Sequence, residues 1–211
     1  MKWTVLIPMR PLRQAKSRLV EATASAAEHL DLVAAMRSDT LAAVTACRSV
    51  ARVVRVLDEP EPSAPEGVLD HVSTGSGLNG VTAEAIAWAT GRWPEDGVAV
   101  LVGDLPSLRA DELDVALQHA AGTGRSFVPD ASGIGTTLLA AAPGVALEPR
   151  FGLDSALRHG VDAVQVPAAA GVRQDVDTPA DLQAAVGLGV GPATLAHLAR
   201  RRVPCVHLDA G

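Results

Sequence analysis

Apolar residues gather in short runs that alternate along the chain with longer stretches of helical spacing. The short runs are rich in valine, leucine and isoleucine and are bordered by turn residues, which is typical of strands. They cover residues 3–7, 52–57, 98–102, 126–128, 137–141 and 163–166. Because apolar residues follow one another within these runs instead of alternating with polar ones, the pattern indicates a sheet that is buried on both faces.

Between the strands, apolar side chains recur every three or four residues, which is the spacing of one helix face. This pattern covers residues 24–47, 81–93, 111–121 and 179–188, and a last helix is expected after residue 191. The proline-rich segment 58–67 is interpreted as a surface connection. Alternating strands and helices predict one α/β domain over residues 1–211, with a mostly parallel sheet between two helical layers.

Composition excludes several classes of protein. Acidic residues outnumber basic ones by 24 to 18, giving a net charge of −6, so we expect no nucleic-acid partner. No run approaches the ~18 apolar residues of a membrane helix, and the first residues lead into a strand and not a signal peptide. Cys47 and Cys205 lack metal or redox spacing, so we expect reduced thiols in a cytoplasmic protein.

The segment after the first strand carries the basic residues Arg10, Arg13, Lys16 and Arg18. Ligands of such sheets bind at the carboxyl ends of the strands, and clustered cations there suit a triphosphate and a departing pyrophosphate. A solvated charged loop is the plain alternative. The segment has no glycine-rich phosphate motif, so neither a P-loop nor a dinucleotide site is indicated.

Acidic residues in two segments are candidates for a magnesium site. Asp104 follows an apolar strand, where a carboxylate can hold Mg²⁺ together with substrate phosphates, although it could instead cap a turn. Thr178 and Pro179 form a good helix start without help from Asp175 or Asp177. One of these two carboxylates, with Asp177 preferred, would complete the site opposite Asp104.

A third group of residues suits a small anion such as a phosphate monoester. Residues 133–136 offer backbone amides and the hydroxyl of Thr136, and Gly152 and Ser155 stand where a helix is expected to start. A hairpin turn followed by an ordinary helix start is the alternative. His159 is assigned no role, because it could be a surface residue.

Together these segments resemble one family, the CofC/FbiD guanylyltransferases, which make the phospho-carboxylate donor for coenzyme F-420. The similar motifs are Ala15-Lys16-Ser17-Arg18-Leu19, Leu78-Asn79, Gly103-Asp104-Leu105-Pro106, Gly133-x-Gly135-Thr136, Phe151-Gly152-x-Asp154-Ser155-x-x-x-His159 and Asp175-Val176-Asp177-Thr178-Pro179. Each motif is weak alone, but all of them in this order are specific. The segment 188–194 resembles the actinobacterial branch in particular.

The resemblance implies a nucleotide-diphospho-sugar transferase fold of the glycosyltransferase-A type. It implies transfer of GMP from GTP to a small phosphorylated carboxylic acid, which is phosphoenolpyruvate in the actinobacterial branch and 2-phospho-L-lactate in archaeal relatives. The acid-binding positions of the family correspond to Thr136, Gly152 and Ser155. Its metal positions correspond to Asp104 and Asp177.

The remaining site predictions concern the nucleotide. Its expected contacts are Pro8, Arg10, Lys16, Asn79, Gly80 and Gly103. Asn79 and Gly80 are assigned to guanine, in a loop that leads into the helix at residue 81. Lys16, with Arg10 or Arg18, is expected to stabilise the departing pyrophosphate. Arg10 departs from the family pattern, since many relatives carry lysine there, and the two side chains grip phosphate differently.

Two other interpretations remain at this stage. A nucleotidyltransferase with another acceptor, such as a molybdopterin or a sugar phosphate, would share the magnesium site, and a preference for CTP over GTP would point to a cytidylyltransferase. A non-catalytic α/β module would tolerate the loss of Asp104. The pattern also leaves open the acid substrate, a homodimer, and whether residues 203–211 form a strand or a frayed end.

Overall fold

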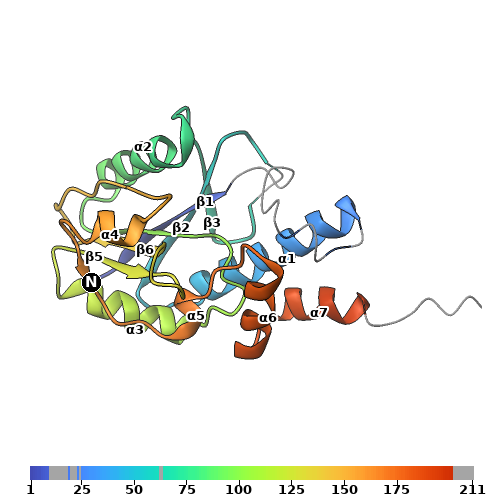
Figure 1. Cartoon of the computed structure of the whole chain (residues 1–211). Helices are drawn as coiled ribbons and strands as arrows, with labels where there is room; N and C mark the ends of the chain where they lie inside the picture. Colours follow the sequence, from blue (N-terminus) through green and yellow to red (C-terminus); the bar gives the residue numbers. More distant parts are fainter. Residues whose placement is uncertain (10–18, 20–22, 24, 62–63, 202–211) are drawn as a thin grey trace, which may run out of the picture.

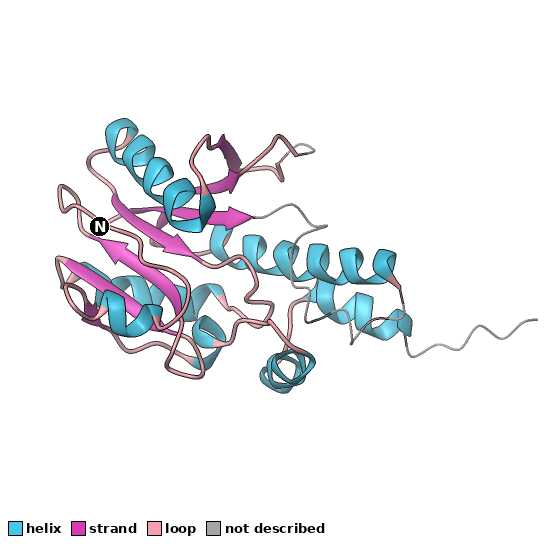
Figure 2. Ribbon diagram, turned by 45° about the horizontal axis from the view of Figure 1, so that its top comes forward, coloured by secondary structure: helices cyan, strands magenta, loops and turns pink. Residues whose placement is uncertain are grey.

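The computed structural model of the chain describes residues 1–9, 19, 23, 25–61 and 64–201. Within these residues, seven strands form one sheet with helices on both faces (Figures 1 and 2). The strands are β1 (Trp3–Met9), β2 (Val50–Leu57), β3 (Val68–Val72), β4 (Gly97–Leu101), β5 (Arg125–Pro129), β6 (Thr136–Ala141) and β7 (Val164–Gln165). The helices are α1 (Ala26–Thr45), α2 (Gly77–Arg92), α3 (Ala110–Ala121), α4 (Ser155–His159), α5 (Ala170–Arg173), α6 (Pro179–Leu188) and α7 (Pro192–Arg201).

The strand order is β3-β2-β1-β4-β6-β5-β7. Neighbouring strands are parallel except at β6, which runs antiparallel to both β4 and β5. The predicted mostly parallel sheet between two helical layers is therefore confirmed. Since β2 and β4 lie on opposite sides of β1, the order reverses next to β1, and ligands are expected at the carboxyl ends of strands at such a point.

Both faces of the sheet are buried. On one face, Val5 and Ile7 of β1 pack with residues of α3 such as Leu117. On the other, Leu6 packs with residues of α2 such as Ala85. Figure 1 shows α2 above the strands and α3 below them. Burial on both sides explains the continuous apolar runs of the sequence.

The first half of α1 packs with α6 and α7 beyond the end of the sheet. Leu32 and Met36 of α1 share this smaller buried cluster with Leu182 of α6. Asp39 of α1 caps α7, because its carboxylate accepts hydrogen bonds from the backbone N–H groups of Ala193 at 2.9 Å and Thr194 at 2.8 Å. The C-terminal helix is thus held by a residue from the first helix.

Replacing Asp39 with alanine should lower the free energy of unfolding by about 1–2 kcal/mol, because the first turn of α7 loses its capping acceptor. Urea unfolding measures the change. Asp31→Ala is the matched control, since Asp31 is exposed on the same helix. An equal loss in the two variants would contradict the capping role.

The structure differs from the sequence-based elements at three places. The edge strand β3 was not predicted, because its five residues include Asp70 and His71 and most of them are not buried; it pairs with β2, and Asp70 accepts a hydrogen bond from Arg55 of β2 at 2.7 Å. Helix α2 begins at Gly77, so Asn79 and Gly80 lie in its first turn and not in a preceding loop. Glycine is a poor helix former, which hides this start. The four-residue helix α5 was also missed.

Two further predictions concern membrane-spanning helices and the segment 203–211. None of the described helices is by itself long and apolar enough to cross a membrane; Pro179–Leu188 and Pro192–Arg200 pass that test only as a pair, with a bend of 119° between them. Residues 203–211 lie outside the described part of the chain, so their role stays open.

Candidate active site

Candidate site residues from several strand ends lie at one edge of the sheet. Pro8 lies near the end of β1, Asp58 follows β2 and Asp104 follows β4. Thr136 begins β6, and because β6 is antiparallel to β4, with Leu101 opposite Leu138, its first residue lies at this same edge. The structure therefore joins the carboxyl ends of parallel strands with the start of an antiparallel one.

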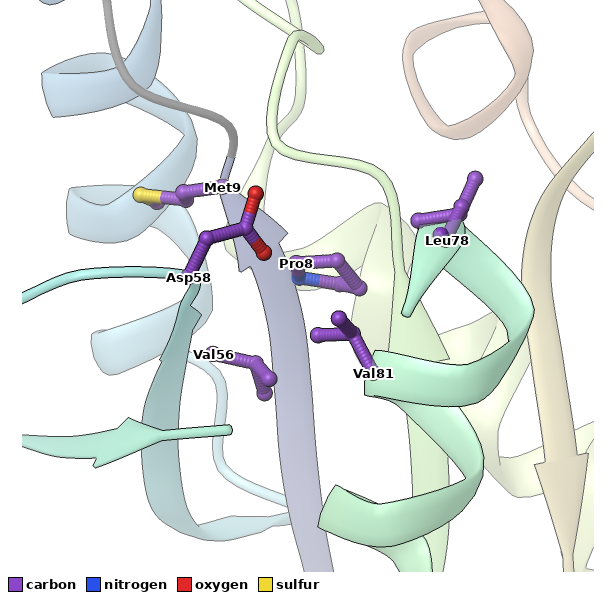
Figure 3. Close-up of a pocket in the computed structure, with 7 residues that line it drawn as sticks. Pro8, Met9, Val56, Asp58, Leu78 and Val81 are labelled. Atoms are coloured by element: carbon purple, nitrogen blue, oxygen red, sulfur yellow. The ribbon is translucent and has the colours of Figure 1, made fainter. Parts of the chain in front are cut away.

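A hollow of about 160 Å³ opens where β1 and β2 end beside the start of α2 (Figure 3). Its lining residues are Pro8, Met9, Val56, Asp58, Gly77, Leu78 and Val81. The carboxylate of Asp58 is turned toward Pro8 in this view. A hollow with mostly apolar side chains and one carboxylate on its wall suits a flat ring that carries N–H donors. Asp58 was missed because it opens a segment that the sequence presents as a surface loop.

The other predicted nucleotide contacts have defined positions. A side chain on Gly103 would bring its Cβ to 3.2 Å from Cγ2 of Ile7, so glycine allows the end of β4 to lie close to β1. The Asn79 side chain donates to the carbonyl of Phe151 at 3.1 Å and accepts from its N–H at 2.7 Å. Asn79 therefore ties α2 to the segment of Gly152, and its contact with guanine stays a prediction.

Asp104 lies beside the second acidic segment. The backbone carbonyl of Asp104 accepts a hydrogen bond from Val176 at 3.1 Å, so Asp175 and Asp177 flank a residue bound to it. One oxygen of the Asp104 carboxylate, Oδ1, is buried. Thr178 and Asp181 form the reciprocal cap of α6, so that helix start does not depend on the Asp177 side chain.

This donor set fits Mg²⁺. Among the described residues, no group of three His, Cys, Asp or Glu side chains is arranged to hold a metal ion. Mg²⁺ in nucleotide-processing sites commonly uses one or two protein carboxylates, and water and substrate phosphates complete its shell. Asp104 with Asp177 or Asp175 would supply hard oxygen ligands of that kind.

Arg37 of α1 adds positive charge near Asp104. Burial lowers the pKa of the Arg37 guanidinium, and the charges of Glu61 and Asp104 partly offset this effect. The arginine is therefore within electrostatic reach of the predicted metal ligand. Sequence reasoning missed Arg37 because it lies inside a helix, remote in sequence from the strand that positions Asp104.

Thr136, Gly152 and Ser155 are brought together by α4. The N–H of Ala156 donates to the carbonyl of Ile134 at 3.0 Å, which ties the helix to the turn before β6. The N–H of Ser155 donates to the carbonyl of Gly152 at 3.2 Å. Ser155 is only 2% exposed, and its hydroxyl makes no hydrogen bond to the described residues. The three positions therefore form one candidate anion subsite.

His159, at the end of α4, is buried and does not lie at the surface. Its Nδ1 is 2.9 Å from Oγ1 of Thr136, and its Nε2 accepts a hydrogen bond from the Arg150 N–H at 2.9 Å. Burial lowers the pKa of the imidazole to about 4, and the charges of Arg150 and Arg158 act in the same direction. His159 therefore contacts Thr136 of the candidate anion subsite, a position that sequence reasoning did not assign to it.

Burial of His159 should make the protein less stable in mild acid. Its pKa of about 4 in the folded protein lies below the usual 6.5, so the unfolded chain binds more protons between these values. The free energy of unfolding should therefore decrease as the pH falls through this window, by about 2 kcal/mol from pH 7 to pH 5.

Urea unfolding at both pH values measures this change. His159→Gln should remove this share, whereas the exposed control His119→Gln should keep it; equal pH dependence in the two variants would contradict the assignment.

Replacing Gly152 with alanine should disturb the anion subsite. Gly152 has a φ of +108°, and a Cβ there would lie 3.3 Å from Nη2 of Arg158. A side chain in this conformation is strained by about 1–3 kcal/mol, so both stability and acid binding should weaken. Urea unfolding and the KM for the acid measure these effects. Gly124→Ala is the control, because nothing lies within 4 Å of the Cβ position there; matching behaviour of the two variants would contradict the prediction.

Arg10, Lys16 and Arg18, the predicted pyrophosphate contacts, lie outside the described residues. The segment that carries them follows Met9, which ends β1 and lines the hollow. Their roles stay predictions.

Known proteins resemble this chain over most of its length. A relative from Streptomyces scabiei, named phosphoenolpyruvate guanylyltransferase, is 43% identical over 220 residues that cover 97% of this chain and 99% of its own. One of the same name from Streptomyces coelicolor is 44% identical, covering 95% of this chain and 97% of its own. A solved structure described as a nucleotide-diphospho-sugar transferase from Desulfovibrio desulfuricans has a TM-score of 0.74 at 18% identity, covering 95% of this chain and 96% of that one.

The structural likeness confirms the predicted transferase fold, and the sequence likeness identifies the group of enzymes. The family described as guanylyl transferase CofC like matches residues 3–198. The match includes all four segments that build the candidate site. The chain belongs to the CofC-like guanylyl transferase family.

Proposed function

We propose that this protein transfers GMP from GTP to phosphoenolpyruvate, giving enolpyruvoyl-diphospho-guanosine and pyrophosphate, as a step of coenzyme F-420 biosynthesis. The observation that carries the proposal is the near full-length identity of 43% and 44% to relatives named phosphoenolpyruvate guanylyltransferase. The fold supports it, because the hollow lined by Pro8 and Asp58, the segment of Asp104 and the start of β6 at Thr136 lie at one edge of the sheet.

In the proposed reaction, Thr136, Gly152 and Ser155 hold the acid. An oxygen of its phosphate attacks the α-phosphorus of GTP in line; a new P–O bond forms as the bond to the departing pyrophosphate breaks. A phosphate monoester is already anionic near neutral pH, so no strong base is required. The protein contributes positioning and charge stabilisation, as in other phosphoryl transfers.

The charged residues stabilise the triphosphate. Asp104 and Asp177, or Asp175 in its place, would hold Mg²⁺. When bound, this ion supplies positive charge that offsets the charge of the triphosphate oxygens. Lys16, with Arg10 or Arg18, is assigned to the departing pyrophosphate.

The hollow of Figure 3 is assigned to the guanine base. Guanine presents an N1–H and a 2-amino group side by side, and a carboxylate can accept from both. Cytosine has no such pair of donors. Asp58 is therefore our candidate for base selection. It joins Asn79 and Gly80, the predicted guanine contacts in the first turn of α2.

Pyrophosphate release with GTP and Mg²⁺ tests the proposal, with phosphoenolpyruvate and 2-phospho-L-lactate offered in parallel. We expect release that requires both GTP and phosphoenolpyruvate and is weak with CTP. Release with 2-phospho-L-lactate but not with phosphoenolpyruvate would identify 2-phospho-L-lactate as the acid substrate. A preference for CTP, or silence with both acids from folded protein, would overturn the proposal. Cytoplasmic location and a homodimer stay predictions, and sedimentation tests the dimer.

A further inference from the structure

The imidazole ring of His159 is held rigidly beside the anion subsite. The residue is 1% exposed. The chain contains only two phenylalanines, and both lie against this ring: Phe151 meets it edge-on at 5.1 Å between centroids, and Phe127 lies at 6.3 Å. A ring packed in this way keeps its two nitrogens in fixed directions.

The hydrogen bonds of the ring determine where its proton sits. The N–H of Arg150 points at Nε2 from 2.9 Å. A backbone N–H can only donate, so Nε2 must be an acceptor without a proton. The charged form and the neutral form protonated at Nε2 are both excluded, and the proton belongs to Nδ1.

This tautomer restricts the hydroxyl of Thr136. Nδ1–H lies 2.9 Å from Oγ1 of Thr136, and it must donate to that oxygen. The threonine proton consequently points elsewhere, and the hydroxyl makes no other hydrogen bond within the described residues. Thr136 is left as a donor, which is the role that a carboxylate or phosphate oxygen requires.

The same ring joins the two parts of the anion subsite. Through Nδ1 it holds Thr136 at the start of β6, and through Nε2 it holds the backbone of Arg150, two residues before Gly152. The charged groups that face the ring are Arg150, Arg158 and Asp162. Loss of the Nδ1 contact with Thr136 should therefore affect the subsite differently from loss of the Nε2 contact with Arg150.

We propose that His159 is a positioning residue: as its Nδ1–H tautomer, it commits the Thr136 hydroxyl to donate to the acid substrate. This proposal rests on the proposed function, because it takes residues 136, 152 and 155 as the acid subsite. It adds a residue that touches neither substrate but fixes the direction in which the Thr136 hydroxyl donates its hydrogen bond.

Two amide variants separate the contacts of the ring. His159→Asn places an amide near the position of Nδ1 and can still donate to Thr136, whereas His159→Gln reaches the position of Nε2 and can accept from Arg150. We expect the KM for phosphoenolpyruvate to rise at least about tenfold in His159→Gln. In His159→Asn the KM for phosphoenolpyruvate should rise much less. The KM for GTP should change in neither of the two variants. The exposed control His119→Gln should leave both KM values unchanged.

A double-mutant cycle with Thr136→Val tests the coupling. The loss of this hydroxyl should raise the KM for the acid at least about tenfold in the wild-type background. In the His159→Gln background it should have less than a third of that effect, because the hydroxyl is no longer committed as a donor. Additive effects, or an equal rise for acid and GTP, would overturn the proposal.

Nitrogen NMR of the imidazole in the free wild-type protein supplies a readout that needs neither substrate nor a variant. We expect Nδ1 of His159 to carry a proton and Nε2 to carry none, and the nitrogen chemical shifts should stay constant from pH 5.5 to pH 8. A proton on Nε2, or a titration near pH 6.5, would overturn the proposal. Absence of pyrophosphate release from the wild type would instead refute the proposed function while leaving this spectroscopic result standing.

Discussion

Replacing Asp104 with asparagine should reduce kcat by at least about 100-fold and leave the protein folded. Asparagine has nearly the same size but lacks the negative charge, so binding of Mg²⁺ to the triphosphate complex should weaken. Pyrophosphate release over a range of magnesium concentrations measures the loss, and urea unfolding checks the fold. Asp111→Asn is the matched control, because the Asp111 side chain is 77% exposed on α3.

The neighbouring carboxylates identify the second ligand. If Asp177 holds the ion, Asp177→Asn should shift the magnesium dependence to higher concentrations, and Asp175→Asn should not. The reverse result would assign the role to Asp175. Full activity of Asp104→Asn would refute the metal site and favour a chain that has kept the fold without this chemistry.

Replacing Ser155 with alanine should raise the KM for phosphoenolpyruvate by roughly 10- to 100-fold, the range expected for loss of a hydrogen bond to a charged group. The hydroxyl has no hydrogen bond within the described chain, so its removal should leave the protein's own hydrogen bonds intact. The KM for GTP should stay the same, because the hollow beside α2 lies in a different part of the site.

Ser38→Ala provides the control for this variant, since Ser38 is exposed on α1. Steady-state kinetics with each substrate varied in turn measure both KM values. An equal increase for acid and nucleotide would place Ser155 between the two substrates and would contradict its assignment to the acid alone.

The sheet, and the edge at which the candidate site residues lie, could be predicted from the sequence because their signals are local. Continuous apolar runs mark strands that are buried on both faces, and a carboxylate directly after such a run marks the edge where ligands bind. Asp104 is the clearest example. Backbone amides and hydroxyls near an expected helix start indicated Thr136, Gly152 and Ser155, and the family motifs agreed, but the proximity of these residues depends on α4 and on the antiparallel direction of β6.

The missed residues depend on contacts between remote segments. Asp58 stands in a segment with loop composition, and only the packing of α2 beside β1 makes it part of a hollow. Arg37 is an ordinary helix residue until the fold brings it near Asp104. A single histidine gives no sign of burial, because its environment is created by aromatic residues from two other segments.

The cap that Asp39 provides for α7 also orders the events of folding. Asp39 precedes the amide that it binds by 154 positions, so α1 leaves the ribosome long before the helix that it caps. Closing so long a loop costs entropy before any contact is gained. The C-terminal helix should therefore dock late, onto a sheet that is already formed. Its opening in the finished protein should be a local event, which leaves the edge of the sheet that carries the chemistry in place.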